Sequence, residues 1–455
     1  MRDRWGFDWT GVRGTHFWRR PKLSRRLFFR HAASAVGGYF LMPTRPMETV
    51  ARGAASPKGT AKNVIFVLMA GGPSHTDTFD LKEGAWTPEF FAPESYGDIR
   101  WPRGILPLLA ERIEDFALVR SVKSWAAVHQ LSQTWVQIGR NPASGLARIA
   151  PHIGSVVSLE LGDMQKAVLP PFLSMNVSSG PGAGYLAPEH GAFYISPGGN
   201  GLGNSSHRDG APAFQRRYNL LNDLDAEARG HDARGTAYAE MQAFNLSARK
   251  LMYNDAVSRA FTWDADTRTR YGNTGFGNAC IATRNILQAG LGTRFVQITI
   301  GGWDNHQNIY QPNANLQART REFDNGLGAL LGDLKESGLL DETLVVAMGE
   351  FGRTVGPLNN QNGRDHFLQQ SLLVAGARVR GGRAIGATDS VGGVTVETGW
   401  RRDREIRAED IEATMYSALG IDWTTIRRDD PLGRGFEYVP FADRDLYGPV
   451  HELWS

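Results

Sequence analysis

Residues 63–69 read Asn-Val-Ile-Phe-Val-Leu-Met and run into Gly71-Gly72-Pro73. A short run that is apolar at successive positions is typical of a strand with both faces buried inside a parallel sheet. The glycines and the proline that follow break this pattern and indicate a loop. The stretch therefore predicts a buried parallel strand that leads into a loop.

Three further runs share this character: each is short, rich in β-branched residues or leucine, and followed by glycine. They are Phe295–Ile300, Thr343–Met348 and Ser371–Val374. Leu316–Leu334 lies between two of them and places its apolar residues on one helical face, and 409–419 also has a helical pattern that ends at Gly420. The alternation of strand and helix predicts a doubly wound α/β fold with a mainly parallel sheet flanked by helices.

The composition is that of a large globular protein. The chain has 455 residues, of which 41% are hydrophobic and 21% charged, and this mixture excludes a disordered, collagen-like or coiled-coil protein. The length fits two or three domains, or one large α/β enzyme with long loops. Residues 180–203 are rich in Gly, Pro and Ser and predict such a loop, either a lid or substrate loop or a disordered one. The single cysteine, Cys280, excludes an intramolecular disulfide and a Cys-rich metal site.

The N-terminus carries the pattern of an export signal. Ser24-Arg25-Arg26-Leu27-Phe28-Phe29 precedes an apolar stretch, 32–42, that is too short to span a bilayer. The paired arginines resemble the twin-arginine signal of bacteria. Small residues near Ala55 suggest cleavage before Ser56, which would make 1–55 a signal peptide and 56–455 the mature protein. A basic amphipathic helix is the alternative.

Charge is distributed unevenly along the chain. Residues 1–55 contain eleven Lys and Arg against three acidic residues, which leaves 39 basic and 44 acidic residues in the rest. A mildly acidic body argues against a nucleic-acid partner, whose binding surface would be a basic patch. From the N-terminal signal we expect an exported periplasmic or extracellular protein, with the twin-arginine machinery as a partner and without a stable transmembrane anchor.

Four polar clusters accompany the predicted strands. In an open α/β sheet, ligands bind at the carboxyl ends of the strands, so these clusters mark the expected site. They are Gly71-Gly72-Pro73-Ser74-His75-Thr76-Asp77-Thr78-Phe79-Asp80, Gly301-Gly302-Trp303-Asp304-Asn305-His306, Gly349-Glu350-Phe351-Gly352-Arg353-Thr354 and Gly363-Arg364-Asp365-His366.

Carboxylates and imidazoles without thiolates suit one or two divalent ions such as Zn, Mn, Ca or Mg. Each residue alone also has an ordinary structural interpretation. Asp77 or Asp80 could cap a helix, His366 could hydrogen-bond its neighbours, and Glu350 could pair with Arg353. The coincidence of four clusters favours a shared metal or anion site.

Together the four clusters resemble an uncharacterised bacterial family of twin-arginine-exported proteins within the alkaline phosphatase-like (sulfatase-like) superfamily. The resemblance extends from about Lys62 to Ile421. It implies an alkaline phosphatase-like fold in which Asp and His ligands hold one or two divalent ions, and a nucleophile at a helix N-terminus. The family's reaction is undefined.

The resemblance also implies roles by position. Asp77 or Asp80 would be the ligand after the first strand, and Glu350 occupies the place of an aspartate ligand, although Phe351 replaces the histidine that usually follows it. Asp304, His306 and His366 resemble further ligands. Arg353 or Arg364 would grip the oxyanion.

The nucleophile motif of sulfatases is missing. Gly139-Arg140 resembles the end of that motif, and counting back ten positions reaches His129 rather than a cysteine. His129 could be a phosphoryl acceptor, a ligand or a general acid/base, and Ser132 could be the nucleophile. A formylglycine sulfatase is therefore not expected.

The sequence thus predicts an exported metal-dependent hydrolase of phosphate or sulfate esters, acting on a small-molecule or polymer ester. Two alternatives stay open. One is a metal- or anion-binding or assembly protein that keeps the fold without turnover. The other is a metal-independent hydrolase that uses a Ser/His pair such as Ser74 and His75.

Overall fold

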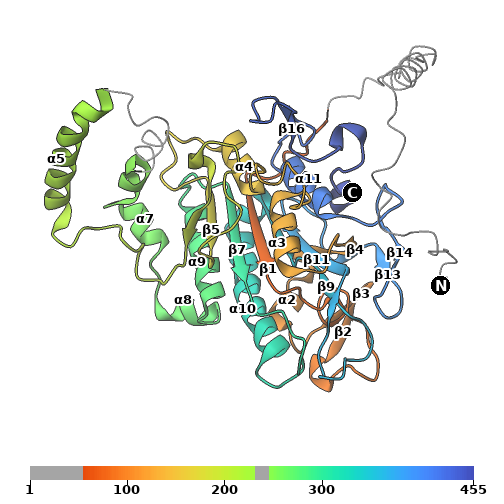
Figure 1. The fold of residues 1–455 in the computed structure, drawn as a ribbon. Helices are drawn as coiled ribbons and strands as arrows, with labels where there is room; N and C mark the ends of the chain where they lie inside the picture. Colours follow the sequence, from red (N-terminus) through yellow and green to blue (C-terminus); the bar gives the residue numbers. More distant parts are fainter. Residues whose placement is uncertain (1–54, 231–244) are drawn as a thin grey trace, which may run out of the picture. The chain divides into compact units, whose positions relative to one another are not determined.

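An eight-stranded sheet forms the centre of the computed structural model, which describes residues 55–230 and 245–455. Seven strands run parallel, and β11 alone runs antiparallel to both of its neighbours, β4 and β8 (Figure 1). The order across the sheet is β12 (Arg383–Ile385), β4 (Phe116–Lys123), β11 (Gln369–Gly376), β8 (Thr343–Met348), β1 (Asn63–Met69), β7 (Phe295–Ile300), β5 (Phe172–Met175) and β6 (Phe193–Ile195).

The predicted fold class is confirmed. The first three predicted strands are β1, β7 and β8 with the predicted bounds, and β1 lies between the other two in parallel register. The fourth, predicted over Ser371–Val374, lies inside β11, whose reversed direction the sequence does not reveal. Because β11 is reversed, its amino end lies at the edge where the parallel strands have their carboxyl ends.

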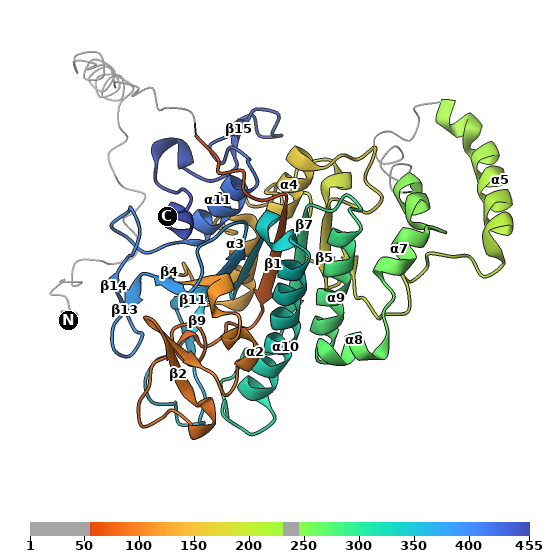
Figure 2. The same cartoon turned by 180° about the vertical axis from the view of Figure 1, so that it is seen from behind.

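Helices cover both faces of the sheet, which makes it doubly wound. Along β1, Ile65 and Val67 face one apolar core and Phe66 and Leu68 face the other, as the period of two in a strand requires. One core packs against α9 (Gly275–Gln288) and α10 (Asn315–Glu336), and the other against α3 (His129–Ile138), α4 (Ile153–Leu161) and α11 (Ala408–Ala418), as the opposite views show (Figures 1 and 2).

The remaining elements are short or peripheral. The helices are α2 (Pro107–Ala110), α5 (Gly210–Gly230), α7 (Asp255–Ala260) and α8 (Ala265–Arg270). Two-stranded ribbons pair β2 (Pro93–Tyr96) with β3 (Ile99–Pro102), β9 (Gly352–Arg353) with β10 (His366–Phe367), β13 (Ala387–Thr388) with β14 (Thr395–Glu397) and β15 (Ile426–Arg427) with β16 (Phe436–Glu437). The 3₁₀ helices are His75–Asp77, Glu89–Phe91, Ile113–Asp115, Pro188–His190, Leu339–Glu342, Ala442–Arg444 and His451–Trp454.

The Gly-rich segment 180–203 contributes to the sheet. It contains the 3₁₀ helix Pro188–His190 and the edge strand β6, and the backbone N–H of His152 donates to Gly182 O at 2.9 Å. The predicted signal peptide lies in residues 1–54 except for its last residue, and so falls outside the described residues. No helix in the described ranges combines the length and the apolar character needed to cross a bilayer.

A buried carboxyl group packs under α3, the helix that begins at His129. Gly139 ends α3 with a φ of 58°, and its Cα hydrogens face the side chain of Glu412 on α11, where a Cβ would overlap the carboxyl oxygens. Tyr416 Oη donates to Glu412 Oε1 at 3.1 Å, while Glu412 Oε2 has no hydrogen-bond partner. Burial raises the pKa of Glu412 to about 8, against a smaller lowering by the charge of Arg140.

This carboxyl group predicts a pH-dependent stability. An unfolded glutamate titrates near 4.5, so between about pH 4.5 and 8 folding takes up a proton and the free energy of unfolding falls as the pH rises. Glu412→Gln should have the stability of the wild type near pH 4.5 and exceed it by about 4 kcal/mol at pH 8. Denaturant unfolding across this range measures the difference.

The exposed Glu336 at the end of α10 gives the matched control, because Glu336→Gln changes the same group in water. We expect its stability to follow the wild type at every pH. A difference between Glu412→Gln and the wild type that stays constant with pH would contradict the assignment of a protonated Glu412.

Candidate metal centre

One edge of the sheet gathers the polar side chains. The carboxyl ends of β1, β7, β8 and β4 meet there with the amino end of β11, so residues far apart in the sequence become neighbours. One ligand atom from each of four side chains lies within 4.8 Å of the others. The four residues, called the His-Asp cluster below, are His129, Asp304, His306 and His366.

His129 is the first residue of α3, six residues beyond the end of β4. Its Nδ1 lies 2.6 Å from Glu350 Oε1, and its Nε2 lies 3.2 Å from Asp304 Oδ1. That Nε2 atom is buried and has no hydrogen-bond partner. The imidazole is therefore held at one nitrogen and presents the other to the cluster.

Asp304 and His306 come from the loop after β7. His306 Nε2 lies 3.0 Å from Asp304 Oδ1, and His306 Nδ1 lies 2.8 Å from Asp365 Oδ1. The hydrogen bond from His306 is the largest cause that lowers the pKa of Asp365. An ionised Asp365 accepts from Nδ1 and leaves Nε2 of His306 directed at the cluster.

His366 lies just before β11 and reaches the cluster because that strand is reversed. Its Nδ1 lies 2.9 Å from the backbone oxygen of Ala127, which can only accept a hydrogen bond. Its Nε2 lies 3.0 Å from Nε2 of His306 and 3.6 Å from Asp304 Oδ1. Burial lowers the pKa of His366, and nearby positive charges lower it further, so the neutral ring is favoured.

These contacts fix the tautomers of all three rings. Each Nδ1 faces an acceptor, so each carries the proton, and a neutral ring then has its lone pair at Nε2. The Nε2 of His306 also faces Arg353 Nη1 at 3.3 Å. Three such lone pairs and a carboxylate oxygen converge on one another. Acceptors repel at these distances unless a cation or additional protons lie between them. The donor set and the orphaned Nε2 of His129 therefore fit a metal ion.

Glu350 lies behind the cluster rather than in it. Its side chain is completely buried and accepts hydrogen bonds from His129, from Gln133 Nε2 at 3.0 Å and from the backbone N–H of Gly71 at 2.9 Å. The sequence assigned Glu350 as a ligand, whereas the structure places it as the residue that orients His129. Such outer partners commonly fix the orientation of a ligand histidine.

Arg353 borders the cluster on the side of Asp304. Its Nη2 donates to Asp304 Oδ1 at 2.5 Å, and its Nε donates to Gly72 O at 2.9 Å. Burial opposes ionisation of Asp304, but the hydrogen bond and the charge of Arg353 keep the pKa of Asp304 below its ordinary value. Arg353 therefore holds Asp304 as a carboxylate and adds a positive charge beside the cluster.

Arg364 and the two early aspartates lie outside the cluster. Arg364 Nε donates to Asp77 Oδ2 at 2.7 Å in a pair with almost no solvent exposure, and Tyr310 Oη donates to Asp77 Oδ1 at 2.8 Å. Asp80 instead pairs with Lys82 at 3.1 Å. These residue types make buried ion pairs as readily as ligands, which explains why the sequence pattern could not separate the two roles.

The other sequence candidates are also engaged elsewhere. Ser132 Oγ donates to Ala126 O at 2.7 Å and is nearly buried. His75 Nε2 lies 2.9 Å from Gly392 O, and the Oγ of Ser74 neighbours Thr76 rather than His75. The structure therefore does not pair Ser74 with His75 as a nucleophile and base. Cys280 is buried in the core.

Solvent reaches the cluster. The side chain of Asp304 is 46% exposed and that of His306 38%, while His129 and His366 keep about a quarter of their surface. The cluster is therefore accessible to an ion from solvent.

Of the three outer partners, the sequence singled out Glu350 alone, and as a ligand. Asp365 stands in the Gly-Arg-Asp-His motif but was named only as its acidic member, and the carbonyl of Ala127 carries no sequence signal. The available clue was that Asp365 and His366 are adjacent in the sequence. An aspartate can orient a histidine ligand while the neighbouring histidine binds the cation.

Comparisons with known proteins describe what the chain resembles. Residues 61–439 match the family described as "Protein of unknown function (DUF1501)". Similar solved structures include the lipoteichoic acid synthase LtaP from Listeria monocytogenes (10% identity, 85% of this chain and 79% of that one, TM-score 0.37). They also include a Pseudoalteromonas sulfatase, PsFucS1 (12%, 80% and 68%, TM-score 0.39), and an alkaline phosphatase superfamily protein from Vibrio parahaemolyticus (10%, 81% and 69%, TM-score 0.36). The search of curated proteins gives no match.

Gly71 is predicted to be essential for this geometry. Its φ is 112°, and a Cβ there would lie 2.7 Å from the backbone nitrogen of Asp304. Gly71→Ala should therefore displace Asp304 and lower the free energy of unfolding by more than about 2 kcal/mol. Calorimetry measures the stability, and elemental analysis after Zn²⁺ loading and desalting measures the retained metal.

Gly338 is the matched control, because its φ is also positive at 74° but a Cβ there would meet open space. Gly338→Ala should cost only about 1 kcal/mol and leave zinc uptake unchanged. Equal behaviour of the two variants would refute the packing argument at Gly71.

Proposed function

The chain belongs to the family described as "Protein of unknown function (DUF1501)", and we propose that it is an exported metal-dependent hydrolase of phosphate or sulfate esters. The convergence of three Nε2 lone pairs on Asp304 carries this proposal. It favours one metal centre, since Asp77 and Asp80 are paired with Arg364 and Lys82. Three imidazoles with one carboxylate suit Zn or Mn better than Ca or Mg, which prefer oxygen ligands.

Within this proposal, the His-Asp cluster holds the ion. When bound, a divalent ion polarises an ester oxygen and makes water a stronger nucleophile. Glu350, Asp365 and the Ala127 carbonyl keep the protons of the three rings at Nδ1, so that Nε2 stays free to coordinate.

Arg353 supplies the fixed positive charge of the site. Its guanidinium is nearly buried and bound to Asp304, so its place is set before a substrate arrives. A preorganised cation beside the centre stabilises the charge that builds up on a phosphoryl or sulfuryl group during transfer. Arg364 has no such role here, because its guanidinium neutralises Asp77.

Water is the nucleophile in the proposed reaction. The water oxygen bonds to phosphorus or sulfur, the bond from that atom to the ester oxygen breaks, and the alcohol leaves with a proton. His129 serves as a ligand rather than as a phosphoryl acceptor, because Glu350 occupies its Nδ1 and the cluster its Nε2. Ser132 is bound to Ala126 O and takes no part.

A second candidate is a metal-binding protein without turnover. It is favoured by the engagement of the two candidate hydroxyl nucleophiles, because Ser132 Oγ donates to Ala126 O and Ser74 Oγ neighbours Thr76 rather than His75. The two functions differ in activity alone, since both require the ion.

The first test of the proposal measures metal and activity together. The mature chain loaded with Zn²⁺ or Mn²⁺ should retain about one ion, and Asp304→Asn or His366→Ala should lower its affinity at least tenfold. Activity on p-nitrophenyl phosphate, bis(p-nitrophenyl) phosphate and p-nitrophenyl sulfate should disappear with chelation and return with metal.

His207→Ala is the control, because His207 lies outside the cluster near α5. It should keep both the ion and the activity. Retention of one ion without turnover on any ester would favour the second candidate, whereas a chain that binds no ion in any variant would exclude both.

Export is tested separately. Arg25→Lys with Arg26→Lys should abolish the appearance of the mature chain outside the cytoplasm, because the twin-arginine receptor reads the arginine pair. Fractionation followed by N-terminal sequencing measures this, and we expect the mature chain to begin at Ser56. The same exchange at Arg19 and Arg20 is the control; equal export of both double variants would contradict a signal at Arg25 and Arg26.

A further inference from the structure

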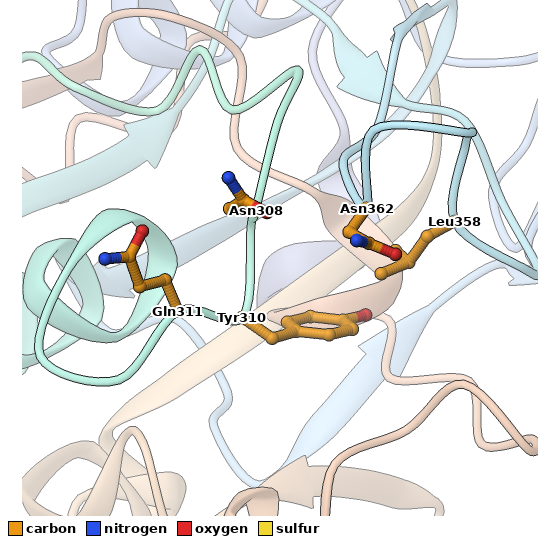
Figure 3. A pocket seen from close by; sticks show the side chains of 5 residues that line it. All are labelled: Asn308, Tyr310, Gln311, Leu358 and Asn362. Carbon is orange, nitrogen blue, oxygen red and sulfur yellow. The ribbon is translucent and has the colours of Figure 1, made fainter.

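A separate cavity of about 550 Å³ opens beside the loops that carry the His-Asp cluster. Its size is typical of small-molecule sites. Figure 3 shows Asn308 and Gln311 on one side, Asn362 and Leu358 on the other, and the ring of Tyr310 between them. These five residues are called the amide pocket below.

The amide pocket and the cluster share the same two loops. Asn308 N donates to Gln361 O at 3.0 Å, and Ile309 N donates to Asn362 O at 2.8 Å, so the segments after β7 and before β10 are tied together. Asn308 is two residues from His306, which limits their separation to about 7 Å along the backbone. The amide pocket therefore adjoins the loop that supplies His306 to the cluster.

The lining is polar but carries no net charge. Three of its five side chains end in carboxamides, each of which both donates and accepts hydrogen bonds, and they make no hydrogen bond to the described residues. The remaining surface is Leu358 and the Tyr310 ring. An anion finds no cation here, and a purely apolar group would leave the three amides without partners.

Tyr310 contributes its ring rather than its hydroxyl. Its Oη donates to Asp77 and accepts from Arg364 Nη2 at 2.9 Å. Burial raises the pKa of Tyr310, and the charge of Asp77 raises it further, so the ring stays neutral. Aromatic faces pack against apolar C–H surfaces, while the amides around the ring match hydroxyl groups.

We propose that the amide pocket binds the uncharged saccharide part of the substrate, so that the ester hydrolysed at the cluster is a sulfated or phosphorylated saccharide. The identity of the ester rests on the proposed function, whereas binding of a neutral saccharide does not. A sugar ring combines C–H faces for Tyr310 and Leu358 with hydroxyls for Asn308, Gln311 and Asn362. The charged group then extends toward Arg353 and the cluster.

Saturation-transfer NMR on the mature chain tests the binding directly. The probes are glucose, galactose, mannose, N-acetylglucosamine, lactose and cellobiose, with cyclohexanol as a neutral compound that lacks the polyol pattern. We expect at least one saccharide to bind, equally well before and after chelation, and to bind more tightly than cyclohexanol.

The variants that remove the amides are chosen to suit the backbone conformation at each position. Asn308 and Asn362 have φ values of 47° and 57°, where glycine is tolerated but alanine is strained, so Asn308→Gly with Asn362→Gly removes both amides without forcing the loops. The Kd of the bound saccharide should rise at least about tenfold. Gln311→Ala, outside that backbone region, should weaken binding by about threefold and guards against misfolding of the double variant.

Asn273→Gly is the matched control, because Asn273 is exposed with a φ of 53° and lies outside the amide pocket. It should bind as the wild type does. Absence of binding for every saccharide, binding unchanged by loss of the amides, or preference for cyclohexanol would overturn the proposal.

The two proposals fail in different ways. Saccharide binding that needs the amides, with no hydrolysis of galactose 6-sulfate, N-acetylglucosamine 6-sulfate or glucose 6-phosphate, would refute the proposed hydrolysis and support the pocket assignment. Metal-dependent hydrolysis of p-nitrophenyl esters without any saccharide binding would refute the pocket assignment and leave the hydrolase in place.

Discussion

The chemistry of this protein depends on where three histidine rings keep their protons. Glu350, Asp365 and the carbonyl of Ala127 each accept from an Nδ1, and so the three Nε2 lone pairs are turned toward Asp304. Arg353 offsets part of that electron density from one side, by donating to Asp304 and, at 3.3 Å, to Nε2 of His306. A divalent ion at the centre would satisfy all four donors at once, which is why the account of function begins with a metal.

The sheet makes this convergence possible through one reversed strand. In a wholly parallel sheet the residues before a strand lie at the opposite edge from those after it. Because β11 is antiparallel to β8, His366 at its amino end meets Asp304 and His306 at the carboxyl end of β7. Gly71 completes the arrangement: it has no side chain to separate β1 from Asp304, and its N–H binds the carboxylate that orients His129.

Much of the scaffold could be predicted from local pattern, and less of the site. The strands β1, β7 and β8 are apolar runs followed by glycine, so the sequence indicates both that they are buried and where they end. The direction of β11 depends on tertiary pairing and leaves no local trace. Asp304, His306 and His366 were proposed as ligands and lie together, with His129 as the fourth member. Asp77 and Asp80 have the carboxylates of metal ligands and Arg364 has the charge of an oxyanion-binding residue, but all three form ion pairs instead. Such pairing depends on the three-dimensional structure and leaves no local pattern in the sequence.

Anomalous diffraction from crystals of the mature chain grown with Zn²⁺ or Mn²⁺ tests the central claim most directly. Data collected on either side of the metal absorption edge locate the ion without reference to the protein atoms. We predict one strong anomalous peak within about 2.0–2.3 Å of Nε2 of His129, His306 and His366 and of a carboxylate oxygen of Asp304. A peak beside Asp77 or Asp80 instead, or an empty cluster at saturating metal, would contradict it.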